Sequence, residues 1–171
     1  LFALSFPLIF GLLFAGDYLT SKKKEKMLIS SAKEIIESNK EKSDKLLNYS
    51  FNESWIIETN DILALYSKTD KHFPCVSVIV SDSIDKSKVF LGFRDYYGKL
   101  NDTIQPIKKD FILKTTKVER EYLYKVFFKN LDEVRFSASD GRYELFYPYI
   151  KDGKRIVLYF SDYQRDGKIG S

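Results

Sequence analysis

The hydrophobic pattern begins with an apolar run. Residues 1–16, LFALSFPLIFGLLFAG, contain no charged side chain. As a helix they would rise about 24 Å, whereas the hydrocarbon core of a bilayer is ~30 Å thick. Because residue 1 is leucine rather than methionine, we expect a transmembrane segment, residues 1–20, that is truncated at its start. A signal-peptide core and a buried core helix are the alternatives.

The next segment, residues 21–49, contains no proline or glycine and is rich in helix-forming residues. Apolar positions recur at spacings of three, four and seven residues, which predicts one amphipathic stalk helix with a single packing stripe. The stripe consists of Leu28, Ala32, Ile35, Asn39 and Leu46, and Ile36 and Leu47 widen it. The stripe can pack on the rest of the chain or pair with a second copy as a homodimer. In a homodimer, Asn39 would set the register of the two helices.

The segment from residue 50 to about residue 134 contains shorter patterns. FNESWIIETNDILALYSKTD predicts a helix capped by Asn52. Its expected apolar side consists of Trp55, Ile56, Ile62, Leu63 and Leu65. PCVSVIVSDS and KVFLGFRDYYG predict two strands joined by residues 82–88. The segment that follows predicts a strand over 111–114 and a helix over about 118–130.

The closing segment, residues 141–163, reads GRYELFYPYIKDGKRIVLYFSDY. Two runs rich in aromatic and β-branched residues flank a four-residue break, Lys151–Lys154, which predicts a β-hairpin. The segments RFSASDGRYELFYPYI and KRIVLYFSDY are expected to complete the sheet. The predicted fold class is α+β: an N-terminal membrane helix and long stalk helix, then an antiparallel sheet backed by helices on one face.

Charge narrows the choice of partners. The net charge is only +4, and lysines alternate with acidic residues along the chain. Nucleic-acid binders usually concentrate basic residues on one face, so no nucleic-acid partner is expected. The one basic block, Lys22 to Lys26, follows the apolar run and favours a cytoplasmic location for the rest of the chain. Lysine is frequent throughout, however, so charge bias does not decide the topology.

The chain offers few residues for catalysis. It has one cysteine, Cys75, and one histidine, His72. An intramolecular disulfide and a common Cys/His zinc site are therefore excluded within the chain, and a Cys–His nucleophile pair is not expected. The nucleotide-binding, hydrolase and metalloprotease motifs GxxxxGK[ST], GxGxxG, GxSxG and HExxH do not occur. We expect no enzyme activity, no cofactor and no metal.

The most suggestive cluster is FRDYYG, which contains Arg94, Tyr96 and Tyr97. An arginine beside two tyrosines at the end of a strand can bind a carboxylate bidentately while the rings close over the ligand. In the alternative interpretation, one tyrosine packs in the core and the arginine is solvated.

The order of elements and the closing hairpin resemble the Cache family, PAS-like extracytoplasmic sensor domains of bacterial chemoreceptors, sensor kinases and cyclic-dinucleotide enzymes. The hairpin matches the family pattern at Pro148, Asp152, Gly153, Lys154 and Asp162. In members that bind amino acids or other small carboxylates and amines, an R-x-W-Y turn lines the pocket. RDYY is similar to this turn, with Tyr96 in place of tryptophan.

The resemblance implies that residues 50–171 form a PAS-like sensing domain of a receptor in the bacterial inner membrane, with the globular part periplasmic or extracellular. It also implies a ligand site formed by Arg94, Tyr96, Tyr97 and Asp162, and an amino acid or other carboxylate as ligand. The alternative function is a membrane-anchored, non-enzymatic subunit of an envelope or transport assembly. The sensor would have a small-molecule pocket, whereas the subunit would co-purify with partner proteins.

Overall fold

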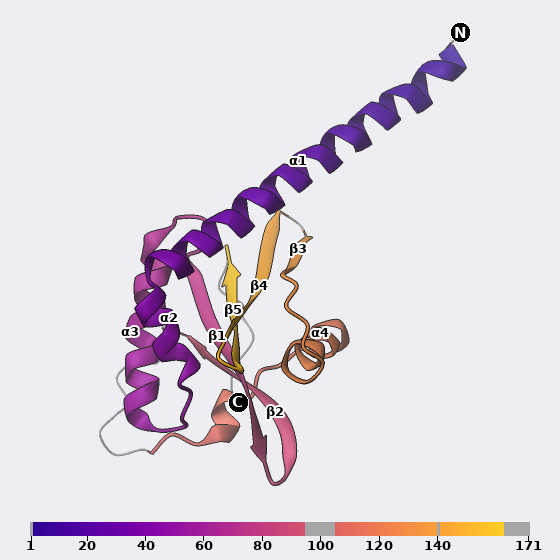
Figure 1. The fold of residues 1–171 in the computed structure, drawn as a ribbon. Coiled ribbons are helices and arrows are strands. Elements are labelled where there is room, and N and C mark those ends of the chain that lie inside the picture. Colours follow the sequence, from indigo (N-terminus) through magenta and orange to yellow (C-terminus); the bar gives the residue numbers. More distant parts are fainter. Residues whose placement is uncertain (1, 95–104, 140, 163–171) are drawn as a thin grey trace.

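The computed structural model describes residues 2–94, 105–139 and 141–162, which form four α-helices and a five-stranded antiparallel sheet (Figure 1). The helices are α1 (Phe2–Ser38), α2 (Lys40–Leu47), α3 (Glu53–Thr69) and α4 (Lys117–Phe128), and a short 3-10 helix, η1, spans Lys108–Phe111. The strands are β1 (Cys75–Ile84), β2 (Ser87–Arg94), β3 (Arg135–Ser139), β4 (Arg142–Lys151) and β5 (Lys154–Ser161). The predicted α+β class is confirmed.

The strands lie in the order β2-β1-β5-β4-β3. Two tight turns connect neighbouring strands: Asp85 and Lys86 have φ values of 50° and 66°, and Asp152 and Gly153 have 52° and 76°. Positive φ at both central residues is typical of the two-residue turn that matches the twist of a β-hairpin. The connections predicted at 82–88 and 151–154 were therefore too long. Lys151 already pairs with Lys154.

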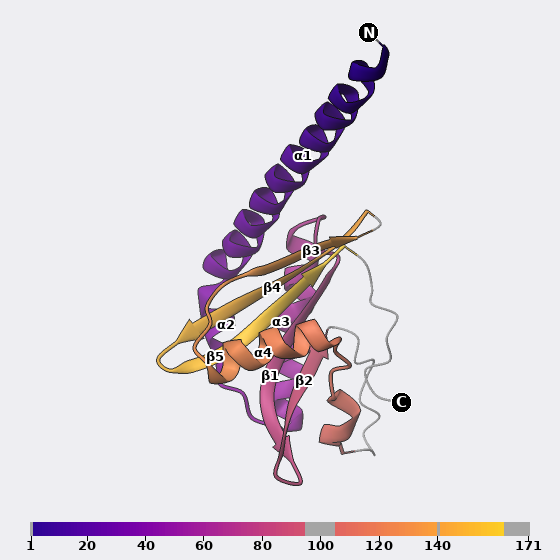
Figure 2. The same ribbon diagram turned by 90° about the vertical axis from the view of Figure 1, so that its right-hand side faces the viewer.

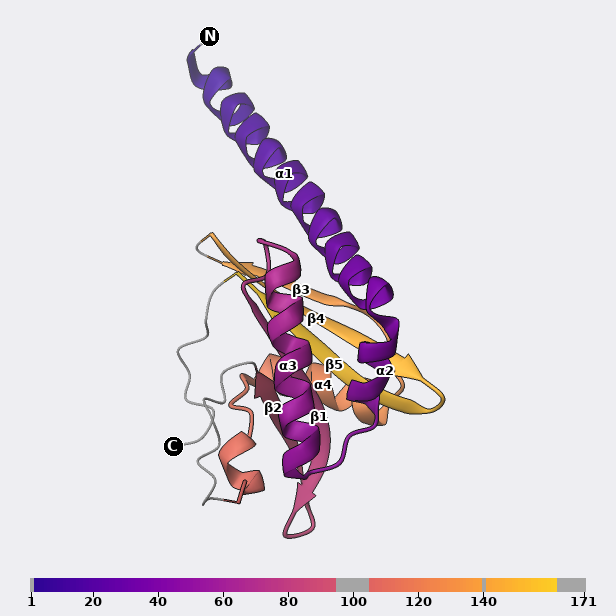
Figure 3. The same ribbon diagram turned by 90° about the vertical axis from the view of Figure 1, so that its left-hand side faces the viewer.

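Helices cover both faces of the sheet. Figures 1 and 3 show α2, α3 and the C-terminal part of α1 on one face, and Figure 2 shows α4 across the other. We call the buried side chains on these two faces the α1–α3 cluster, which includes Leu63 and Val78, and the α4 cluster, which includes Ile79 and Leu123. Val78 and Ile79 are consecutive residues of β1, so β1 contributes to both clusters. The expectation of helices on one face only was wrong. Consecutive residues of the central strands are apolar, so both faces of the sheet carry apolar side chains that a helix covers.

The helix predicted for residues 21–49 is interrupted. α1 runs without a break from Phe2 to Ser38, Asn39 leaves the helical conformation, and α2 continues the chain. The predicted stripe is confirmed as a packing stripe, because Leu28, Ala32 and Leu46 are fully buried in the α1–α3 cluster. Of the two alternatives for the stripe, the structure shows packing on the chain's own sheet. A homodimer through the stalk stays a prediction and would need other side chains.

The predicted membrane segment at residues 1–20 is not shown. Within the part of the chain that the structure describes, no helix combines the length and apolar character needed to cross a bilayer. The membrane segment therefore stays a prediction.

Helix α3 confirms most of its prediction. The side chain of Asn52 caps it by accepting a hydrogen bond from the N–H of Trp55 at 2.8 Å. Leu65, however, is exposed, and Tyr66 takes the buried position next to it. The strand expected at 111–114 is wrong. The chain there forms η1 and a single bridge between Ile112 and Leu91.

Candidate functional site

The register of the sheet places Arg94 at one end of a row of side chains that crosses all five strands. Arg94 lies opposite Ser77, Ser77 opposite Tyr159, Tyr159 opposite Phe146, and Phe146 opposite Arg135. Directly paired residues share a face of a sheet. Because Phe146 and Tyr159 pack in the α4 cluster, the whole row, Arg94 included, lies on the α4 face.

A second polar row lies next to the first, nearer the end of the sheet. Ser161 is paired with both Cys75 and Glu144 on this face. The Tyr159 hydroxyl donates a hydrogen bond to Oε1 of Glu144 at 2.8 Å, which ties the two rows together. Figure 2 shows that α4 crosses the sheet away from the β3–β4 turn at this end. We call Ser77, Arg94, Glu144, Tyr159 and Ser161 the polar end of the α4 face.

Arg94 is the charged residue of this group whose side chain has no ion-pair or hydrogen-bond partner among the described residues. This side chain is half-buried. A guanidinium in a partly desolvated position binds a carboxylate or phosphate more strongly than one in bulk water. Arg94 can therefore supply the charged contact for a small anionic group.

The other predicted site residues divide into two groups. Tyr96 and Tyr97 lie outside the described residues. Asp162 lies at the same end of the sheet as Arg94, but its carboxylate accepts a hydrogen bond from the Tyr143 N–H at 3.0 Å. Tyr143 packs in the α1–α3 cluster, so the register does not bring Asp162 and Arg94 to the same face. Asp162 closes the β4–β5 ladder.

Sequence reasoning missed Ser77, which is paired with Arg94, and Tyr159 and Glu144, which lie on the next strands of the same face. A polar residue alternating with valines in CVSVIV, and the glutamate in RYELF, were visible signs of polar positions on an otherwise apolar face. Their position on the same face as Arg94 depends on the strand order, which the local pattern does not give.

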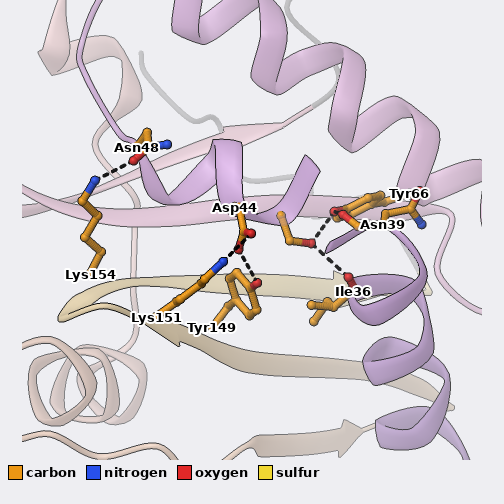
Figure 4. A network of polar contacts seen from close by, with 9 residues as sticks. Ile36, Asn39, Asp44, Asn48, Tyr66, Tyr149, Lys151 and Lys154 are labelled. Atoms are coloured by element: carbon orange, nitrogen blue, oxygen red, sulfur yellow. Dashed lines mark hydrogen bonds and ion pairs between the residues drawn. The ribbon is translucent and has the colours of Figure 1, made fainter. Parts of the chain in front are cut away.

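A second polar network, on the α1–α3 side, connects the Asn39 break to the sheet (Figure 4). The fully buried Ser43 shares a hydrogen bond of 2.6 Å with the Tyr66 hydroxyl. The Asp44 carboxylate accepts hydrogen bonds from the Tyr149 hydroxyl at 2.7 Å and from Lys151 Nζ at 2.6 Å. The bonds from Lys151 and then Tyr149 lower the pKa of Asp44. This network fastens α2 to α3 and to β4.

Ser31, Asp70 and His72 are in contact, but not as a nucleophile–base pair. The Ser31 hydroxyl bonds to one carboxylate oxygen of Asp70, and His72 Nδ1 lies 2.7 Å from the other. The carboxylate therefore separates the hydroxyl from the imidazole, whereas a hydrolytic triad needs the imidazole to contact the hydroxyl. Within the described ranges, no group of three or more metal-ligating side chains comes together.

Comparison with known proteins adds no relative. No protein-family model, no curated protein and no solved structure matches the chain. The function has to be argued from the site, because a fold class alone does not define a function.

Proposed function

We propose that the chain is the extracytoplasmic small-ligand sensing domain of a bacterial membrane receptor, with its globular part periplasmic or extracellular. One observation carries the proposal. Arg94 stands half-buried, without a partner among the described residues, at the polar end of a sheet face. A structural arginine in such a position normally has an acceptor, because an unmatched charged donor loses hydration without compensation.

The ligand proposed for this position is a small carboxylate, such as an amino acid or organic acid. Its carboxylate would bind the Arg94 guanidinium, and the hydroxyl-bearing side chains of Ser77 and Tyr159 in the same row would contact its other polar groups. Tyr96 and Tyr97, which the Cache resemblance adds to the site, stay a prediction.

The other face of the same sheet supports a signalling role. The last turns of α1 and the buried side of α2 pack there, and Asp44 binds two side chains of β4. β4 also contributes Glu144 to the polar end. A ligand that shifts β4 would therefore act on the helix that leads to the proposed membrane segment, provided that it binds the two positions of β4 with different affinities.

Isothermal titration calorimetry on the purified 171-residue chain tests the proposal. A panel of amino acids and organic acids is expected to contain a ligand whose affinity falls roughly 10- to 150-fold in Arg94→Ala, the value of a charged hydrogen bond of about 1.5–3 kcal/mol. Lys68→Ala is the matched control, because it removes a positive charge from an exposed position on α3. Emission from the single, buried Trp55 shows whether each variant is folded.

Two outcomes contradict parts of the proposal. Tight binding that is equally strong in Arg94→Ala would move the site elsewhere on the molecule. Absence of binding across the panel would favour the alternative function, an anchored subunit that holds a partner protein. Val118 and Tyr124, which are 61% and 45% exposed on α4, are the apolar side chains that such a partner could cover.

A further inference from the structure

The break at Asn39 is a conflict between the local sequence and the tertiary structure. Residues 21–49 contain neither proline nor glycine, and the local pattern predicts one continuous helix. Asn39 nevertheless adopts φ −121° and ψ 36°, outside the helical region. Sharp bends in helices usually have a proline, a Gly/Ser pair or an inserted side chain as their cause. Here proline and glycine are absent, and the inserted side chain is that of Ser43, which binds the Ile36 carbonyl and also contacts Tyr66 of α3.

The carbonyl groups before the break are capped by side chains. Three consecutive carbonyls, of Glu34, Ile35 and Ile36, accept hydrogen bonds from side chains of Ser38, Asn39 and Ser43, respectively. In a continuous helix, the N–H of residue 40 would bind the Ile36 carbonyl instead. These carbonyls can therefore accept hydrogen bonds in both the bent and the straight form. Neither form needs to leave a buried backbone carbonyl without a donor.

Three contacts hold the bent form. Ser43 binds the Tyr66 hydroxyl of α3, and Asp44 binds Tyr149 and Lys151 of β4. Leu46 and Leu47 of α2 are buried in the α1–α3 cluster. All of these groups follow the break, and none of them would keep its partner if α2 extended straight from α1. The bend is thus maintained by tertiary contacts against local helical preference.

We infer that the Asn39 break is a two-state joint, in which Asp44 latches α2 to β4 in the bent form and releases it when α1 and α2 merge into one helix. The burial of Leu46 and Leu47 makes the bent form the dominant one in the free chain. This inference deepens the proposed sensing function by naming the element that moves. Its test needs no ligand, so it stands or fails separately from the site at Arg94.

Distance measurements between two spin labels report the state of the joint. The full chain, with Cys75→Ser, carries labels at Lys23→Cys on α1 and Lys45→Cys on α2. A continuous helix would place these two positions about 33 Å apart, and the bent form places them closer together. Lys45 is exposed and forms an ion pair with the exposed Glu58 of α3, and the loss of this pair is common to all variants.

Two kinds of variant move the equilibrium by different routes. Lys151→Gln weakens the latch from the β4 side, and Asn39→Ala favours helical conformation at the joint. Each is expected to raise the population near 33 Å, and the two together are expected to raise it several-fold more than either alone. Lys68→Gln, on the exposed side of α3, is the matched control and is expected to leave the distribution unchanged.

Trp55 emission shows whether each variant is folded, so that a change in distance can be assigned to the joint and not to unfolding. Trp55 emission is expected to stay that of the native chain, because α3 and the sheet do not move. If Lys151→Gln unfolds the chain, Tyr149→Phe replaces it, since that variant deletes a single hydroxyl from the latch. The deciding sample is the folded double variant, which combines Asn39→Ala with Lys151→Gln or with its replacement, Tyr149→Phe. If the distance distribution of this variant equals that of the parent chain, the bend is rigid and the inference is overturned.

Discussion

At the scale of single residues, carboxylates join segments that are distant in the sequence. Asp82 on β1 accepts hydrogen bonds from the Tyr49 hydroxyl at 2.5 Å and from Lys108 of η1. Asp44 and Asp70 do the same for α2 and α1. Asp82 holds η1 against β1, Asp44 holds α2 against β4, and Asp70 joins α1 to the C-terminal end of α3.

Stability is expected to fall in acid because of these groups. Burial opposes ionisation of Asp82, but the bonds from Lys108 and Tyr49 outweigh it, so the pKa of Asp82 is lowered. The pKa of Asp44 and that of Asp70 are lowered too. A carboxylate with a lowered pKa stabilises the folded state above its unfolded pKa, about 3.9, and loses that contribution as the pH falls through its folded pKa.

Urea unfolding followed by Trp55 emission at pH 7, 5 and 3 measures this effect. The midpoint is expected to change little from pH 7 to 5 and to drop below pH 4. In Asp82→Asn the midpoint is expected to be lower at pH 7 and to drop less on acidification. The same drop in wild type and Asp82→Asn would show that Asp82 makes no contribution to the acid response.

At the scale of elements, the sequence predicted a helix cap and a hairpin turn, which depend on residues close together in the chain. The Asn52 cap, helix α4 and the closing hairpin were predictable because caps and turn residues act within a few positions of the chain. The break at Asn39 was not, because Tyr66, Tyr149 and Lys151 lie far along the sequence from the segment they hold.

The candidate site shows the same division between local and long-range information. Arg94 stood out as an arginine at the end of a predicted strand. Its neighbours Ser77 and Tyr159 became visible only with the strand order, since β5 returns from the end of the chain to lie beside β1. Asp162 shared the expected end of the sheet, but the alternation of faces along β5 separates it from Arg94.

Helix α4 offers a test of one such local determinant. The Thr116 hydroxyl accepts a hydrogen bond from the Glu119 N–H, and the buried Glu119 carboxylate accepts one from the Thr116 N–H at 2.8 Å. Thr116→Ala is expected to lower the free energy of unfolding by about 1 kcal/mol, because an orphan N–H of the first turn loses its acceptor. Chemical denaturation followed by circular dichroism measures the loss.

Thr115→Ala is the control for this substitution. Among the described residues, the Thr115 hydroxyl accepts a single hydrogen bond, of 3.3 Å, from the exposed Arg120 side chain. Its removal is expected to change the free energy of unfolding by less than about 0.5 kcal/mol. If both variants lost the same stability, the capping box would not be the cause.

At the scale of the whole molecule, the two faces of the sheet are covered unequally. The α1–α3 cluster takes in side chains from three helices, from four of the five strands and from η1. The α4 cluster contains one helix on the opposite face. Because buried apolar area is the main stabilising term, α4 is held by much less free energy than α3.

Hydrogen exchange measured by mass spectrometry is therefore expected to separate the two layers. Amides of α4 are expected to exchange through local opening, well before those of α3, whose buried Ile56, Leu63 and Tyr66 open only with the whole domain. Leu123→Ala, which removes a fully buried side chain from α4, is expected to speed exchange in α4 several-fold and to leave α3 nearly unchanged. Simultaneous exchange of both helices would show one cooperative unit and would contradict this unequal layering.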